Sequence, residues 1–170
     1  MESSRLREWD YSIPWWYYIT ISTKNFEICF GEIKNSNVIL NELGKVVEEE
    51  WNKTKKIREN VDLDRYVIMP NHFHGITIIK DVETSRRGVS REKETDQRPV
   101  STNLKRDSLG SIIGQFKSIC TKRIRKLGFE NFQWQQRFYD HIIRDENDLR
   151  SIRTYIQNNP VKWEMDEYYR

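Results

Sequence analysis

The sequence has few cysteines and no long hydrophobic run. Its two cysteines, Cys29 and Cys120, are too few for a disulfide-rich scaffold or a zinc ribbon. No apolar stretch approaches the ~20 residues that a transmembrane helix needs, and the opening MESSRLREWD lacks the hydrophobic region of a signal peptide. Collagen-like and coiled-coil repeats are absent as well. We therefore expect a soluble, cytoplasmic protein with no membrane partner.

The composition is that of a polar but folded chain. Of the 170 residues, 36% are hydrophobic and 32% are charged, and the mean hydropathy is −0.84. Aromatic residues reach 12%, with 6 Trp, 8 Tyr and 7 Phe, which is enough to fill a core. This length is typical of one domain, so we expect a single domain over residues 1–170.

Positive charge is concentrated in one part of the chain. The net charge is only +3, but residues 86–126 contain 12 basic and 4 acidic residues. That stretch carries +8, and the remainder carries −5. Clustered Lys and Arg bind polyanions by releasing condensed counterions, which favours a nucleic-acid partner. A solvated loop followed by a helix with a charged outer face would give the same number of basic residues. The polar residues at about 82–106 predict a mobile basic loop.

Hydrophobic periodicity predicts strands and helices in alternation. Runs of β-branched and aromatic residues predict strands at 15–23, 64–69, 72–79 and 138–144. Residues 26–33 and 37–40 are predicted to form short strands or the arms of a hairpin around the polar turn KNSN. Apolar residues at helical spacing predict helices at 43–60, 108–128 and 145–159, with Ser108 and Asp145 as N-caps. The predicted fold class is α+β: a ferredoxin-like sandwich in which helices pack on one face of an antiparallel sheet, followed by a C-terminal helix.

Two histidines stand at the start of one predicted strand. His72 and His74 flank Phe73, and because side chains alternate along a strand, both imidazoles share one face. Their Cα atoms would lie ~6.6 Å apart, a spacing at which both rings can approach one divalent metal.

The final predicted helix offers further candidate groups. Tyr155 and Asn159 are four residues apart and therefore lie on one helical face. The phenol could act as a nucleophile, and the amide oxygen could reach a hard cation. Alternatively, Tyr155 is an aromatic residue at the edge of the core, and Asn159 caps the helix before Pro160.

These residues carry a resemblance to a known family. The block from Met69 to Ile76, MPNHFHGI, resembles the HUH motif of single-tyrosine HUH transposases. The blocks WQQRFYDHIIR, from Trp134, and YIQNNPVKW, from Tyr155, resemble the REP-associated tyrosine transposases (RAYTs). REWDY, from Arg7, and YITISTKN, from Tyr18, are also similar to members of this branch. The resemblance spans nearly the whole chain except residues 82–106.

The resemblance implies a metal-dependent enzyme that cleaves and rejoins single-stranded DNA at hairpins or imperfect palindromes. Carried over by position, His72, His74 and Asn159 would bind Mg²⁺ or Mn²⁺, and Tyr155 would be the nucleophile that forms a 5′-phosphotyrosine intermediate. Classical mobile relatives are dimers and the REP-associated branch tends to be monomeric, so monomer and homodimer both remain open.

Other residues compete for roles or add to them. Tyr139 is the alternative nucleophile, and His141 is a possible third ligand or DNA contact, although a packed histidine is the simpler interpretation. Trp15, Trp16 or Trp134 could stack on bases. The residues expected to contact the DNA backbone are Lys117, Lys122, Arg123, Arg125 and Lys126.

Two other functions fit parts of the pattern. A catalytically silent module that binds single-stranded nucleic acid is one, although the RNP signature of RNA-binding sheets is absent. A metal-dependent hydrolase that uses the two histidines without a covalent step is the other, but the sequence lacks the second His-x-Thr/Ser element that a two-histidine phosphoesterase requires.

Overall fold

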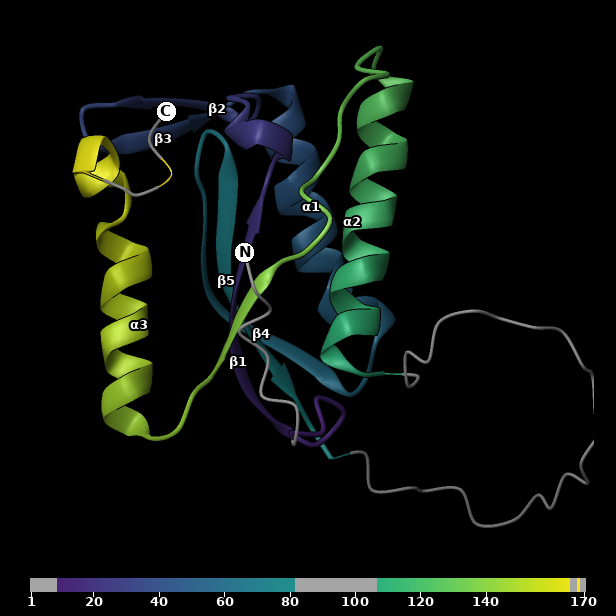
Figure 1. Cartoon of the computed structure of the whole chain (residues 1–170), viewed down its shortest axis with the longest axis vertical. Coiled ribbons are helices and arrows are strands. Elements are labelled where there is room, and N and C mark those ends of the chain that lie inside the picture. Colours follow the sequence, from purple (N-terminus) through teal and green to yellow (C-terminus); the bar gives the residue numbers. More distant parts are fainter. Residues whose placement is uncertain (1–8, 82–106, 166–167, 169–170) are drawn as a thin grey trace, which may run out of the picture.

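A computed structural model of the chain describes residues 9–81, 107–165 and 168. The predicted basic loop at 82–106 lies outside the described residues. The centre of the molecule is an antiparallel sheet in the order β4-β5-β1-β6 (Figure 1). Its strands are β1 (Trp15–Ser22), β4 (Val61–Ile68), β5 (His72–Ile79) and β6 (Tyr139–Ile142).

Helices cover both faces of this sheet. The helices α1 (Glu42–Ile57) and α2 (Leu109–Lys126) pack together on one face, and α3 (Glu146–Asn158) lies on the other (Figure 1). The predicted α+β architecture of an antiparallel sheet with packed helices is confirmed. Within the described part of the chain, none of these helices has the length and apolar character that crossing a membrane requires.

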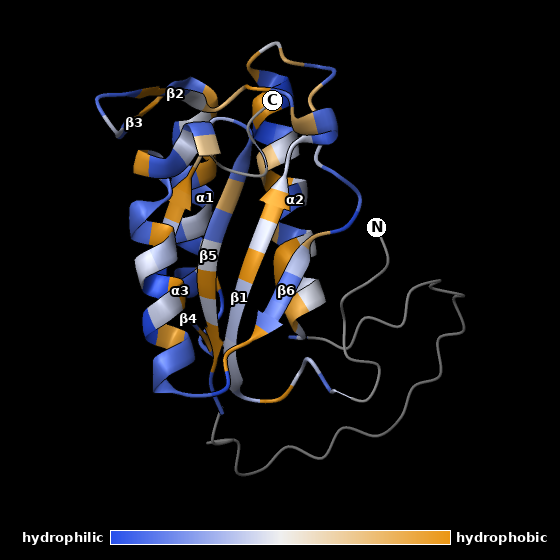
Figure 2. Cartoon of the chain, turned by 60° about the vertical axis from the view of Figure 1, so that its left-hand side comes forward, coloured by the Kyte–Doolittle hydropathy of each residue, from blue (hydrophilic) through white to orange (hydrophobic). Residues whose placement is uncertain are grey.

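Strand alternation explains why both faces are covered. Along β1, Tyr17, Ile19 and Ile21 enter the large core under α1 and α2, whereas Tyr18 enters a smaller cluster under α3. Because β5 is central, almost all of its residues are buried. Figure 2 shows that apolar residues are concentrated on these central strands. The sheet therefore has a thick apolar layer on one side and a thinner, more polar layer under α3.

The N-termini of α2 and α3 are capped by the side chains that the sequence predicts. Ser108 accepts a hydrogen bond from the Ser111 amide at the start of α2, and Asp145 accepts from two amides at the start of α3. Each cap satisfies backbone donors that have no partner within the helix. After α2, Gly128 adopts a φ of +97°, which ends the helix as predicted.

The segment between β1 and α1 differs from the prediction. The predicted hairpin around the KNSN turn forms, as β2 (Gly31–Lys34) and β3 (Asn37–Leu40), but its first arm is shorter than the predicted 26–33 because the chain first forms a short 3₁₀ helix, η1 (Lys24–Phe26). Positive φ angles at Asn25 and Phe26 interrupt the extended backbone. The amides of Cys29 and Phe30 then both donate to the Pro70 carbonyl, so this loop packs against the turn before β5.

Candidate metal and tyrosine site

The two histidines of β5 lie side by side under α3. Both are buried, with 0% of His72 and 1% of His74 exposed. Their ring centroids are 4.5 Å apart. Phe73 between them points into the opposite core, where its ring packs on Trp51. The two imidazoles therefore share one face of the strand.

Hydrogen bonds orient the His72 ring. Its Nδ1 lies 2.8 Å from Oδ1 of Asn71. The Asn71 amide nitrogen donates to the carbonyls of Phe26 and Tyr168, which assigns Oδ1 as an acceptor. His72 therefore donates from Nδ1, and the lone pair of the neutral ring is on Nε2.

Two side chains of β1 orient the His74 ring, and they also do so through its Nδ1 atom. Nδ1 of His74 lies 2.7 Å from the hydroxyl of Tyr18 and 2.8 Å from that of Thr20. Either oxygen can accept a hydrogen bond from Nδ1, and in that tautomer the lone pair of His74 is on Nε2. Both Nε2 atoms are buried and have no hydrogen-bond partner within the described residues. Two orphaned acceptors so close together are unusual in a protein interior.

Burial keeps both rings neutral. It lowers the pKa of His72 to about 3, and the neighbouring Asn159 side chain acts in the opposite direction. Burial and, after it, the charge of His72 hold the pKa of His74 well below its ordinary value. The neutral imidazole is the form that binds a metal ion.

The end of α3 places two further candidate residues beside this pair. The Tyr155 ring centroid lies 5.3 Å from that of His74, in an edge-to-face arrangement, and 42% of Tyr155 is exposed. One helical turn later Asn159 caps α3 and is buried, with its side chain next to His72. Leu149 and Ile156 hold the helix on the sheet.

A pocket that we call the tyrosine pocket opens beside Tyr155. It has a volume of about 480 Å³. Its lining residues are Tyr18, Thr20, Tyr139, His141, Ile152, Tyr155 and Tyr168. The ring of Tyr139 contacts that of Tyr18, whereas the ring of Tyr155 contacts both Tyr18 and His74. Both nucleophile candidates thus line one pocket, and Tyr155 contacts the histidine pair.

Residues near the C-terminus cover the outer side of His72. The 3₁₀ helix η2 (Pro160–Met165) places the Trp163 ring 5.9 Å from His72, and the Tyr168 ring lies 4.6 Å from it. Sequence reasoning missed these two residues, as well as Tyr18 and Thr20. No spacing rule identifies them, because they reach the histidines from other elements.

The residues present fit a divalent metal. Within the described ranges no group of three His, Cys, Asp or Glu side chains could hold a metal ion, so any ligand set must extend beyond these residue types. The two Nε2 lone pairs and the amide of Asn159 supply a neutral nitrogen and oxygen donor set. Imidazole and oxygen ligands together suit Mn²⁺ and, with more oxygen ligands, Mg²⁺.

The third histidine takes part in a local hydrogen bond. Nε2 of His141 lies 2.8 Å from Oδ2 of Asp148, and the same oxygen accepts from the Arg144 amide. His141 therefore joins β6 to the first turns of α3 at the edge of the tyrosine pocket.

The predicted DNA-contact residues separate into two groups. Lys117, Lys122 and Arg125 line a second pocket, which we call the basic groove, with a volume of about 950 Å³. Arg123 faces α1 instead and pairs with Glu49 and Glu50. Lys126 is exposed at the end of α2 but is not part of the groove lining.

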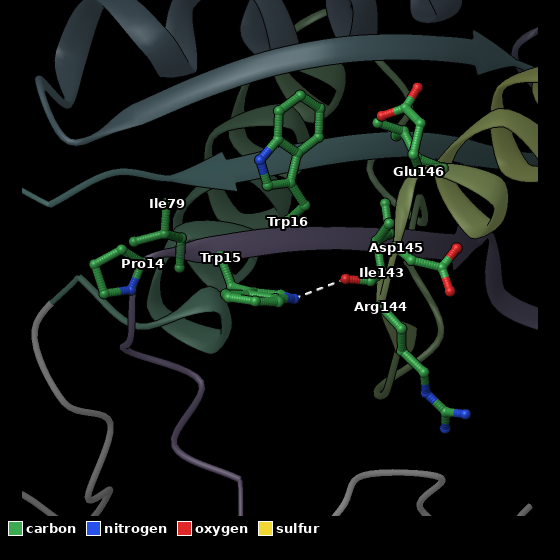
Figure 3. Close-up of a pocket in the computed structure, with 9 residues that line it drawn as sticks. Pro14, Trp15, Trp16, Ile79, Ile143, Arg144, Asp145 and Glu146 are labelled. Atoms are coloured by element: carbon green, nitrogen blue, oxygen red, sulfur yellow. Dashed lines mark hydrogen bonds between the residues drawn. The ribbon is translucent and has the colours of Figure 1, made fainter.

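The tryptophans proposed as base-stacking groups differ in exposure. Trp134 is buried and packs against Phe30 and Phe132 in the core. Trp15 and Trp16 line a pocket of about 480 Å³ at the other end of the sheet. Figure 3 shows the Trp15 indole held in place by its hydrogen bond to the Ile143 carbonyl, at 2.7 Å.

Comparisons with known proteins identify relatives. No protein-family profile matches the chain. A protein of uncharacterised function from Haemophilus influenzae is 38% identical over 167 residues, covering 98% of this chain and 92% of its own length. A second Haemophilus influenzae protein, named as a candidate REP-associated tyrosine transposase, is 55% identical over 29 residues, or 17% of this chain and 16% of its own.

Two solved structures align with the chain. A REP-associated tyrosine transposase bound to a REP hairpin aligns with a TM-score of 0.59 and 22% identity, covering 96% of this chain and 76% of that one. A candidate transposase from Deinococcus radiodurans aligns with a TM-score of 0.48 and 12% identity, covering 93% and 97%. The first alignment shows the fold, and the short sequence match agrees with it. The resemblance carried by the sequence motifs is confirmed: the chain shares the fold of a REP-associated tyrosine transposase, and a stretch of 29 residues matches a candidate member of that family. The chain belongs to the same family as the Haemophilus influenzae protein of uncharacterised function that it matches along almost its whole length.

Proposed function

We propose that this protein is a metal-dependent transesterase that cleaves and rejoins single-stranded DNA next to hairpins or imperfect palindromes. In this proposal His72, His74 and Asn159 hold Mg²⁺ or Mn²⁺, and Tyr155 is the nucleophile. The observation that carries it is the pair of buried, neutral imidazoles with orphaned Nε2 atoms beside the Tyr155 ring.

The chemistry follows from a phenol next to such a pair. A bound divalent ion would polarise a scissile phosphate and stabilise the charge that develops on it. The Tyr155 oxygen attacks the phosphorus and the bond to the 3′ oxygen breaks, so that the phenol gives up one proton and the departing 3′ oxygen takes one up. The products are a 5′-phosphotyrosine and a free 3′-OH. Because one ester replaces another, a second DNA end can reverse the step without an external energy source.

The positions of the two tyrosines support Tyr155 over Tyr139. Tyr155 projects from a helix whose next turn carries Asn159, so the nucleophile and the amide ligand move as one unit. Tyr139 begins β6, and its ring contacts that of Tyr18. We therefore assign Tyr139 to contacts with the DNA strand in the tyrosine pocket.

A solved relative bound to a REP hairpin supports a hairpin partner. For this chain we propose backbone contacts from Lys117, Lys122, Arg125 and Lys126. Arg123 is left out because two carboxylates of α1 already neutralise it. A chromosomal DNA partner agrees with the cytoplasmic location that the sequence predicts, and repeated imperfect palindromes flanking the gene would support this substrate.

A second function, binding of single-stranded DNA without cleavage, is favoured by one observation. Trp163 and Tyr168 cover His72, and access to its Nε2 requires them to move. In the silent module they would stay in place, and no covalent product would form.

The test is covalent capture on labelled DNA. A hairpin with single-stranded flanks is incubated with the protein and Mn²⁺, and the products are separated under denaturing conditions. We expect a protein–DNA adduct that a chelator prevents, that Tyr155→Phe abolishes and that Tyr139→Phe retains. Loss of the adduct only in Tyr139→Phe would make Tyr139 the nucleophile. Cleavage without an adduct would favour the hydrolase, and binding without cleavage would favour the silent module.

A further inference from the structure

A histidine that the mechanism above does not use lies in the wall of the tyrosine pocket. His141 belongs to β6 and is partly exposed, and it lines the pocket together with Tyr139 and Tyr155. A tyrosine holds its proton at neutral pH, whereas an imidazole can both give up and take up a proton there. Among the residues that line the pocket, His141 is therefore the one suited to proton transfer.

Asp148 determines which nitrogen of the His141 ring is engaged. Nε2 of His141 lies 2.8 Å from Oδ2 of Asp148, and the Arg144 amide donates to the same oxygen at 3.0 Å. Burial acts to raise the pKa of Asp148, but the hydrogen bonds from Arg144 and His141 hold it below its ordinary value. The ionised carboxylate accepts from Nε2 and stabilises the protonated imidazole, which leaves Nδ1 as the nitrogen that can serve a ligand.

Strand register separates His141 from the candidate nucleophile. On the sheet face under α3, one cross-strand row is His74, Thr20 and Tyr139, and the next row is Ile76, Tyr18 and His141. Figure 2 shows β5, β1 and β6 side by side. Rows on one face are ~6.6 Å apart, and β5 and β6 are ~9.6 Å apart across β1. Because the Tyr155 ring contacts that of His74, His141 lies diagonally across the sheet face from that contact.

The spacing along α3 gives the same separation. Asp148 and Tyr155 are seven residues apart, so both lie on one face of the helix with ~10.5 Å between them along its axis. Ile152 lies between them in the sequence and lines the tyrosine pocket. Since Asp148 anchors His141, the imidazole and the phenol of Tyr155 enter the pocket from different ends.

This separation matches the geometry of phosphoryl transfer. The attacking and departing oxygens lie in line, on opposite sides of the phosphorus. With Tyr155 at one end of the pocket, the departing 3′ oxygen faces the end at which His141 lies. An alkoxide is a poorer leaving group than a phenolate, so the 3′ oxygen is the atom that most needs a proton as its bond breaks.

We infer that His141 is the general acid of strand cleavage and the general base of rejoining, with Asp148 as its positioning residue. This inference rests on the proposed function. As the bond from phosphorus to the 3′ oxygen breaks, protonated His141 gives its Nδ1 proton to that oxygen, and the phenol proton of Tyr155 passes to solvent. In rejoining, the neutral ring takes the proton of the 3′-OH as this oxygen attacks the 5′-phosphotyrosine, and the released phenolate regains a proton from solvent.

A modified leaving group tests the assignment. One hairpin substrate carries the natural 3′ oxygen at the linkage that the wild-type protein cleaves, and a second carries a 3′-bridging sulfur. The sulfur departs as a thiolate, which needs no proton at neutral pH or above. Single-turnover adduct formation with Mn²⁺ is measured on both substrates for the wild type, His141→Gln and Asp148→Asn. Glu146→Gln is the matched control, because it removes an exposed carboxylate of the first turn of α3 that does not line the tyrosine pocket.

On the oxygen substrate, we expect His141→Gln to form the adduct about 100-fold more slowly than the wild type. Asp148→Asn should also be slower, because an amide can donate to Nε2 and favour the wrong tautomer. On the sulfur substrate both variants should react at the wild-type rate, and Glu146→Gln should do so on both substrates. His141→Gln should also keep the wild-type affinity for the uncleaved hairpin and the wild-type stabilisation by Mn²⁺.

Three results would overturn the inference. Equal slowing of His141→Gln on both substrates would make this residue a structural link between β6 and α3. Loss of the stabilisation by Mn²⁺ would make it a metal ligand, and an unchanged rate on the oxygen substrate would leave it without a role in the reaction. The proposed function survives each of these results, because the wild-type adduct still forms. If the wild-type protein forms no adduct on either substrate, the proposed function fails and this inference fails with it.

Discussion

The hydroxyl of Tyr18 lies 2.7 Å from Nδ1 of His74, so a β1 side chain determines which nitrogen of a β5 histidine faces the candidate site. Burial raises the pKa of Tyr18, which keeps this hydroxyl protonated at neutral pH. Hydrogen bonds of this kind orient metal-binding histidines and raise their affinity.

Removing the Tyr18 hydroxyl should weaken metal binding. We expect Tyr18→Phe to reduce Mn²⁺ affinity about tenfold, because His74 loses one of the two oxygens that orient its ring. Isothermal titration with Mn²⁺ measures the change. Tyr66→Phe is the control, since this tyrosine bonds to Asn52 and packs against the other core. Equal losses of Mn²⁺ affinity in both variants would indicate a general loosening of the fold instead of a specific effect on His74.

Metal binding should stabilise the folded protein through the histidine pair. At a free Mn²⁺ concentration of 100 times its Kd, we expect a gain of about 2.7 kcal/mol in the free energy of unfolding. Replacing His72 and His74 together by alanine should abolish that gain, as followed by thermal denaturation with and without Mn²⁺. His141→Ala should retain it, because this histidine is paired with Asp148. A gain that survives in the double variant would contradict the ligand assignment.

The ring of Tyr168 should slow access to the site. Because the centroid of the Tyr168 ring lies 4.6 Å from that of the His72 ring, we expect Tyr168→Ala to accelerate formation of the DNA adduct. Tyr168→Phe keeps the ring and should react at the wild-type rate. Single-turnover adduct formation measures both. If Tyr168→Phe forms no adduct, then the hydroxyl of Tyr168 rather than that of Tyr155 is the nucleophile.

Gly75 should be intolerant of a side chain. A Cβ there would lie 2.7 and 2.8 Å from ring atoms of Phe73 and 2.9 Å from Trp51. We expect Gly75→Ala to lower the free energy of unfolding by about 1–3 kcal/mol, measured by urea denaturation, because the added methyl group overpacks the core. Gly114→Ala in α2 is the opposite case, since no atom lies within 4 Å of its Cβ. It should stabilise by about 0.5–1 kcal/mol.

The groove should lose affinity for DNA as pH rises through about 8. Burial lowers the pKa of Lys117 to about 8, so its charge is present at pH 7 and largely lost at pH 9. We expect the salt slope for hairpin binding to fall by a fraction of one unit over this range. The Lys117→Met variant should bind the hairpin with the lower salt slope at both pH values. The same shift makes the unfolded state bind more protons between pH 8 and 10.5, so this lysine costs stability below pH 8, and the cost is relieved as pH rises.

The sequence determined the local structure and the identity of the candidate groups. Period-2 and period-3.6 patterns located the main strands and helices, and side-chain caps located their ends, because these signals depend on neighbours within a few residues. The His-Phe-His triplet also predicted which faces its side chains occupy. The hairpin arm predicted over 26–33 was too long at its start, because contacts with the turn before β5 bend residues 26–30.

Only the tertiary structure decided how these groups are combined. It placed α3 on the face opposite α1 and α2, which brings Tyr155 against His74. It also selected Tyr18 and Asn71 as the partners of the two imidazoles, paired Arg123 with α1, and joined Lys24 and Arg137 to the basic cluster of α2. Apart from the contact between the neighbours Asn71 and His72, these contacts link residues distant in the sequence, and no periodic pattern encodes them, since they depend on which faces the whole chain must bury.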